Sequence, residues 1–163
     1  MFEINEAVIH YREGLSTIIA INNMNGMDYF LLRTNKENSE TIYVPVENAN
    51  NIIRPIMDEK EADSILKYIK GIKKEFNPNT KQRRDSYKRK LSSGQVKELA
   101  YLYKQLGYYY KAGGEGNIEI RLGQVDIEML NNAKTMLLDE LTLSYKVDRY
   151  QIDDFIEKRM KKL

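Results

Sequence analysis

Cationic side chains concentrate in one segment of the chain, Lys67–Lys90. This segment holds ten Lys and Arg residues against two acids, a net charge of +8, whereas the 163-residue chain as a whole carries a formal charge of +2. On a helix, Lys81, Arg84 and Lys88 would share one face, where like charges repel one another. A polyanion relieves that repulsion, so the segment indicates contact with a nucleic-acid backbone. A solvated lysine-rich helix face is the alternative that charge by itself leaves open.

Other residues and motifs that commonly act in catalysis, metal binding or phosphate binding are scarce. The absence of cysteine excludes disulfides, thiolate metal sites and a cysteine nucleophile. The single histidine, His10, falls at a predicted strand end and is expected to be structural. The Gly-rich run 113–116 lacks the features of a phosphate-binding loop and is expected to connect two helices. We therefore expect no catalytic residue, no metal site and no cofactor.

Three consecutive tyrosines, Tyr108–Tyr110, form the remaining candidate motif. Exposed aromatic rings can stack on nucleic-acid bases, so a base-stacking surface is one interpretation. Packing in a core or an interface at the end of a helix is the interpretation that we favour.

The secondary-structure elements that must position these residues fall into two regions. In the first region, residues 1–56, the sequence pattern predicts strands. Asn25-Gly26 lies between two β-branched or aliphatic runs, and both residues tolerate the positive φ of a tight hairpin turn. Four or five short strands joined by tight turns predict a small antiparallel barrel, with an open, curled sheet as the alternative. Pro45 indicates that the fourth strand ends at a sheet edge.

Residues 57–163 change to the 3.6-residue period of helices. Capping patterns at 58–61, 92–95 and 148–151 are interpreted as the starts of the first, third and fifth helices. A second helix is predicted over 81–91. Five helices predict a compact helical domain, so the fold class is α+β, a barrel-like antiparallel β domain followed by a five-helix domain.

Length and composition narrow the classes of protein to which this chain can belong. A chain of 163 residues, 42% of them hydrophobic, can form one domain or two small ones with a sizeable core. No apolar run approaches the ~18 residues of a membrane span. The acidic start of the chain, Met1–Glu6, does not look like a signal peptide. We therefore expect a soluble, cytoplasmic protein that is not an enzyme.

Several segments, taken in order, carry a resemblance to a known family. Residues 6–32 contain three strand-like runs, and Val44–Asn48 has the sequence Val-Pro-Val-Glu-Asn, the most specific of the segments. Arg83 followed by Lys90–Gly94, and the apolar positions within 130–141, continue the pattern in the helical region. In this order and spacing, nearly the whole chain resembles the CarD/CdnL family of bacterial transcription regulators.

The resemblance implies a two-part transcription factor. Residues 1–56 would form a Tudor- or SH3-like domain that docks on the β subunit of RNA polymerase. Residues 57–163 would form a helical domain that contacts promoter DNA with low sequence specificity and stabilises the open complex. The implied polymerase contacts are Met24, Ile42, Tyr43, Val44 and Pro45. The implied DNA contacts are Lys81, Arg83, Arg84, Lys88, Arg89 and Lys90.

The chain also departs from the family pattern. The family usually carries a tryptophan wedge ahead of the basic segment, whereas this chain has no tryptophan and Thr80 stands at about that position. Asp85, Met24 and Tyr43 stand where basic residues are common. One alternative is therefore a module that binds polymerase without touching DNA. A small ligand-binding protein or enzyme is another, and would need a deep pocket with convergent polar groups.

Overall fold

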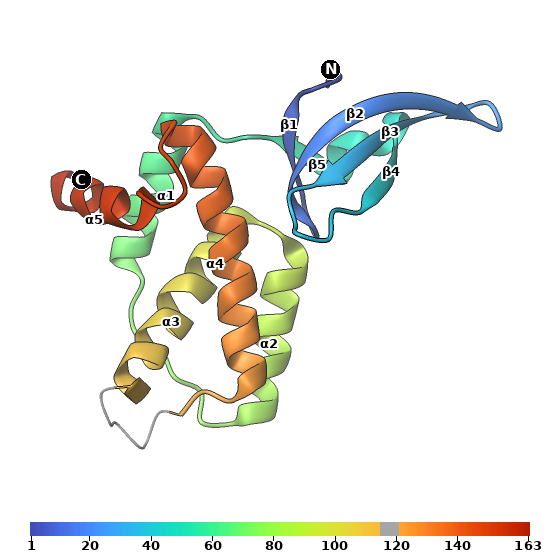
Figure 1. Cartoon of the computed structure of the whole chain (residues 1–163). Helices are drawn as coiled ribbons and strands as arrows, with labels where there is room; N and C mark the ends of the chain where they lie inside the picture. The colour runs from blue at the N-terminus through green and yellow to red at the C-terminus, as the bar shows by residue number, and fades with distance from the viewer. Residues whose placement is uncertain (115–120) are drawn as a thin grey trace. The chain divides into compact units, whose positions relative to one another are not determined.

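The computed structural model describes residues 1–114 and 121–163 of the chain. Contacts within the chain divide it into two compact units, Met1–Ile56 and Met57–Leu163. The first unit is built from strands and the second from helices (Figure 1). The predicted α+β fold class is confirmed.

The first unit is a five-stranded antiparallel sheet. Its elements are β1 (Ala7–His10), β2 (Gly14–Met24), β3 (Met27–Thr34), β4 (Thr41–Pro45), the 3-10 helix η1 (Val46–Asn51) and β5 (Ile53–Pro55). The strands are ordered β4-β3-β2-β1-β5, so β4 and β5 lie at opposite edges of an open sheet. Helix η1 connects these two edge strands and packs against β3, β4 and β5.

The core of the sheet follows from the alternation of its side chains. Residues on one face of a strand recur every second position, so β3 sends Phe30, Leu32 and Thr34 inward. The ring of Phe2 meets the Phe30 ring edge-on at 6.2 Å between centroids. The buried apolar cluster consists of Val8, Ile18, Phe30, Leu32, Val44, Ala49 and Ile53.

Two turns of the sheet use the residues that their geometry requires. Asn25 and Gly26 both have positive φ, 54° and 81°, as the predicted hairpin turn between β2 and β3 demands. In the turn after β1, His10 is buried and its Nδ1 accepts the backbone N–H groups of Arg12 and Glu13, at 3.2 and 3.1 Å. His10 therefore holds this turn, as expected of a structural histidine.

The second unit packs five helices around one apolar core. They are α1 (Glu59–Gly71), α2 (Thr80–Ser93), α3 (Val96–Gly114), α4 (Gln124–Tyr145) and α5 (Ile152–Lys162). Helices α3 and α4 form the central pair, α1 and α2 pack against both of them, and α5 packs against α1 and α4. Within the described residues, no helix combines the length and apolarity needed to cross a bilayer.

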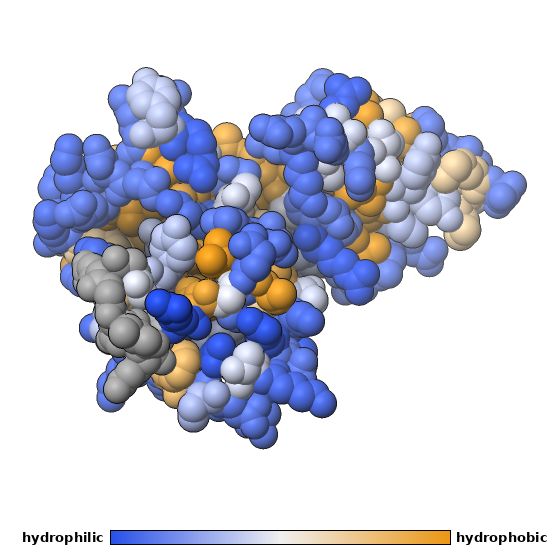
Figure 2. All heavy atoms as spheres, turned by 60° about the horizontal axis from the view of Figure 1, so that its bottom comes forward, coloured by the Kyte–Doolittle hydropathy of each residue, from blue (hydrophilic) through white to orange (hydrophobic). Residues whose placement is uncertain are grey.

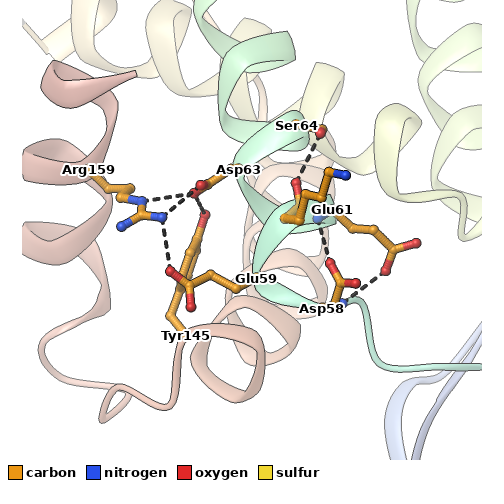
Figure 3. A network of polar contacts seen from close by, with 8 residues as sticks. Asp58, Glu59, Glu61, Asp63, Ser64, Tyr145 and Arg159 are labelled. Atoms are coloured by element: carbon orange, nitrogen blue, oxygen red, sulfur yellow. Dashed lines mark hydrogen bonds and ion pairs between the residues drawn. The ribbon is translucent and has the colours of Figure 1, made fainter.

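Of the three helix starts predicted from capping patterns, one is confirmed and two are wrong. The start at Asp58 is confirmed, because the Asp58 carboxylate accepts the Glu61 N–H at 2.7 Å and the Glu61 carboxylate accepts the Asp58 N–H at 2.9 Å (Figure 3). The start at Ser92 is wrong, since Ser92 lies in the last turn of α2. The start at Asp148 is also wrong, because α5 begins four residues later, at Ile152.

The predicted Gly-rich connector at 113–116 is only partly within the described residues. Gly113 and Gly114 belong to the last turn of α3, whereas Glu115 and Gly116 lie outside the described residues. Helix α3 therefore extends further than its apolar pattern indicated.

A polar network fixes α5 on the helical core, as Figure 3 shows. Arg159 of α5 donates to both carboxylate oxygens of Asp63 in α1, at 2.9 and 2.7 Å, and to Glu59 at 2.9 Å. Tyr145 at the end of α4 donates its hydroxyl to the same Asp63 carboxylate at 2.8 Å. The hydrogen bonds from Arg159 hold the pKa of Asp63 below its ordinary value. Three helices thus share one ionised carboxylate.

Candidate functional site

The basic segment ends in helix α2, whose boundaries are set by local capping. The Asn79 side chain accepts the Gln82 N–H at 3.0 Å and starts the helix, while Gly94 at φ 62° ends it in the left-handed conformation. The predicted helix is therefore present. Only Arg83 and Tyr87, one turn apart, are buried on its inner face.

Arg83 lies inside the helical unit and is only 5% exposed. Its guanidinium donates to the Asn77 carbonyl at 2.9 Å, stacks over the Phe76 ring at 4.8 Å and lies 3.9 Å from the Asp126 carboxylate. Its Nε has no hydrogen-bond partner among the described residues. The predicted DNA contact at Arg83 does not fit this placement, because the cation would have to leave its partners and the core to reach a phosphate.

Arg84 is held by the same carboxylate. Its Nε and Nη2 donate to Oδ1 and Oδ2 of Asp126 at 3.3 and 3.2 Å, and Asp126 also accepts the Gly123 N–H at 3.0 Å. The hydrogen bond to Asp126 raises the pKa of Arg84 above its ordinary value. Asp126 is fully buried, and a carboxylate in that position requires compensating cations. Of the three cations predicted to share one helix face, Lys81 and Lys88 are exposed, whereas the partly exposed Arg84 is paired with Asp126.

Lys90 links α2 to α3. Its Nζ lies 2.6 Å from the Glu98 carboxylate and 4.7 Å from the centre of the Tyr101 ring. Burial raises the pKa of Tyr101 to about 12, so its phenol stays protonated beside Lys90. Lys90 thus serves packing between two helices, although part of its side chain remains exposed.

Three of the six predicted DNA contacts remain available on the outer face of α2. Lys81 and Lys88 are exposed two turns apart, and Arg89 is exposed next to them. In the described part of the chain no acid pairs with these three cations, although the exposed Asp85 lies between them in sequence. Figure 2 shows that hydrophilic residues cover most of the visible face of the helical unit. The outer face of α2 is therefore a modest cationic surface.

The second candidate site is the free edge of strand β4. Within the described residues, β4 pairs with β3 alone. The Thr34 N–H donates to the Glu40 carbonyl at 3.1 Å, and because hydrogen-bonded and non-bonded pairs alternate, the main-chain groups of Tyr43 point away from β3. Pro45, which has no N–H, occupies an equivalent outward position. Tyr43 is also 51% exposed, so this edge offers both main-chain and side-chain contacts.

The inward-facing residues of β4 are much less accessible to a partner protein. Val44 is buried in the core of the sheet, and Ile42 packs against that core from a half-buried position. Both pair with β3, through Phe30 and Leu32. The predicted contact at Val44 does not fit this placement, since the register turns both its side chain and its main-chain groups away from the free edge.

The tip of the β2–β3 hairpin carries a group of exposed apolar side chains. Met24, one of the predicted contacts, pairs with Met27 on either side of the turn, and Met27 is 52% exposed. A hollow of about 290 Å³ joins this tip to the end of β4, with Met27 and Pro45 in its wall. The sequence did not identify Met27 and the exposed Ile21 as candidate contact residues, because sequence alone does not distinguish an exposed apolar residue from a buried one.

The comparisons with known proteins agree with this two-part arrangement. A family model described as CarD-like/TRCF RID domain matches residues 2–57, and one described as CarD, C-terminal domain, matches residues 64–157. A search among curated proteins found no match. The RID domain is an RNA polymerase-interacting domain, which gives the chain a role in transcription through RNA polymerase. With both of its parts matched and the predicted resemblance confirmed, the chain belongs to the CarD-like family.

Proposed function

We propose that the protein docks on the β subunit of RNA polymerase through residues 1–56 and contacts promoter DNA through residues 57–163, thereby stabilising the open complex. The free edge of β4, in a domain of the RID type, is the observation that carries this proposal. The outer face of α2 supplies the DNA contact.

Docking uses the edge of the sheet. A partner strand that pairs with β4 gains main-chain hydrogen bonds from the outward groups of Tyr43, while the exposed Tyr43 ring and the methionines of the hairpin tip give apolar contact. Two carboxylates, Asp28 and Glu47, line the hollow between the hairpin tip and the end of β4. Docking therefore combines main-chain hydrogen bonds and burial of apolar area with a locally negative surface.

The proposed DNA contact depends on the negative charge of the phosphate backbone and not on the base sequence. Lys81, Lys88 and Arg89 can neutralise backbone phosphates, and phosphate contacts position a protein on a duplex without specifying bases. Three cations bind DNA weakly when they act alone. Because polymerase docking raises the effective concentration of DNA near α2, the two weak contacts reinforce one another.

A pair of variants at one position tests the docking edge. Tyr43→Ala removes the ring and keeps the outward N–H, whereas Tyr43→Pro removes both and leaves the β3–β4 hydrogen bonds in place. In pull-down of full-length protein with RNA polymerase, we expect Tyr43→Ala to weaken binding and Tyr43→Pro to weaken it much further. Equal binding by the two variants would show that β4 does not pair with the polymerase.

A second candidate function is polymerase binding without DNA contact. It is favoured by the internal use of Arg83, Arg84 and Lys90, and by Thr80, a small side chain that cannot act as a wedge. The salt dependence of DNA binding separates the two candidates, as described in the Discussion.

A further inference from the structure

A groove of about 470 Å³ runs between α3 and α4, next to the C-terminal ends of α1 and α5. Its floor is apolar and includes Ile69 of α1, Leu130 of α4 and Met160 of α5. Its volume is within the range of small-molecule sites in proteins. None of its lining residues belongs to α2, so the groove is built independently of the proposed DNA contact.

Gly107 opens this groove on the α3 side. It lies in the interior of α3, where glycine is less favourable than alanine, and its φ is not positive. A Cβ added at Gly107 would meet no atom within 4 Å, so neither the backbone nor the packing requires glycine here. The missing side chain leaves space in the groove for something else.

Tyrosine rings form part of the walls. Tyr110 is 55% exposed, and Tyr108 is exposed to a smaller degree, while Tyr109 between them is buried in the core. Lys74 covers one face of the Tyr108 ring at 3.8 Å from its centre. One face of Tyr108 is therefore already occupied, and the more exposed Tyr110 offers the aromatic surface that can stack on a planar ring.

The rim is cationic. Lys104, Lys111 and Lys134 line the groove, and among its described lining residues there is no carboxylate. Lys134 lies 3.5 Å from Asp153, an ion pair in which both side chains are largely exposed and which contributes little. Lys70 adds charge nearby, since its Nζ donates to the carbonyl of Met160. The field at the groove therefore favours an anion.

We propose that the groove between α3 and α4 binds a nucleoside polyphosphate, with the base stacked among the tyrosines and the phosphates held by Lys104, Lys111 and Lys134. The proposal combines an apolar floor, aromatic walls and a cationic rim in one hollow of suitable size. An uncharged nucleoside would lack the phosphate contacts, and an inorganic polyphosphate would lack the stacking. Both features together identify the ligand class.

Calorimetric titration of the full-length protein with ATP tests this assignment. We expect saturable binding, with adenosine and inorganic tripolyphosphate each binding about tenfold more weakly or worse, because each lacks one set of contacts. Gly107→Leu should abolish ATP binding by filling the groove, and circular dichroism should show that the variant remains folded, since the new Cβ meets open space.

Charge variants complete the test. Lys104→Gln with Lys111→Gln should weaken ATP binding about tenfold or more, because the substitutions remove two charge-assisted hydrogen bonds to phosphate. The matched control, Lys60→Gln with Lys158→Gln, removes the same charge at exposed positions that do not line the groove and should leave the affinity unchanged. Equal weakening by both pairs, absence of saturable ATP binding, or an oligonucleotide that binds this groove more tightly than ATP would overturn the proposal.

Discussion

Arg84 and Asp126 are joined by two hydrogen bonds across 42 residues of sequence, and Asp126 is completely buried. The same carboxylate lies beside the buried Arg83, so one acid of α4 compensates two cations of α2. Part of the basic segment is therefore structural. This relationship reduces the cationic surface offered to DNA and fixes α2 on α4.

Replacing Asp126 should destabilise the helical unit strongly. In Asp126→Asn the side chain can still accept the Gly123 N–H, but Arg83 is left buried without a counter-charge, and we expect the free energy of unfolding to fall by about 3 kcal/mol. Urea unfolding measures this change. The control, Glu98→Gln, breaks the partly exposed pair with Lys90 and should cost about 1 kcal/mol or less. Similar changes for both variants would contradict the structural role of Asp126.

Salt dependence measures which cations touch DNA. In the triple variant Lys81→Gln, Lys88→Gln, Arg89→Gln the slope of log K against log salt for promoter fragments should become shallower, by up to about 0.9 for each phosphate that the protein no longer neutralises. A triple variant of exposed lysines elsewhere, Lys60→Gln, Lys158→Gln, Lys162→Gln, is the control with the same net charge. If both triple variants change the slope equally, α2 holds no DNA site, and polymerase binding without DNA contact becomes the better account.

A tryptophan at position 80 should strengthen the effect on the open complex. Thr80 is exposed in the first turn of α2, where an aromatic side chain has room to insert into a kinked base step. We expect Thr80→Trp to lengthen the half-life of open complexes severalfold in a competitor-challenge assay. Gln82→Trp, also exposed, adds the same ring two residues away and should have no such effect. A half-life that is unchanged in Thr80→Trp would place the upstream edge of the melted DNA away from the start of α2.

Acid should destabilise the β unit through His10. Burial lowers the pKa of His10 below its ordinary value of 6.5, so between the two values the unfolded chain binds more protons than the folded chain. The stability is therefore fully present above pH 6.5 and is lost as pH falls through the folded pKa. Protonation at Nδ1 removes the acceptor for the N–H groups of Arg12 and Glu13.

The comparison with His10→Asn isolates this effect. An asparagine oxygen can accept the same N–H groups but does not titrate, so thermal melting between pH 7.5 and 5 should show a smaller decrease in stability for His10→Asn than for the unmodified protein. Parallel pH dependences would mean that other groups cause the acid sensitivity.

Local patterns in the sequence predicted much of the secondary structure. The hairpin at Asn25-Gly26, the capping box of Asp58 and Glu61 and helix α2 all depend on residues only a few positions apart. Where two local signals competed, the prediction failed. Ser92 has the pattern of an N-cap, but Gly94 two residues later ends α2 and displaces the start of α3 to Val96.

The sequence by itself determined the division into strands and helices and the family, because alternation, helical period, turn residues and the order of short motifs are all properties of neighbouring residues. Only the tertiary structure decided which cations face solvent and which apolar residues stay exposed. The sequence does not distinguish Arg83 from Lys88. In the structure Arg83 is buried beside Asp126, whereas Lys88 is exposed to solvent. The partners that decide burial lie tens of residues away, at distances that a linear pattern does not encode.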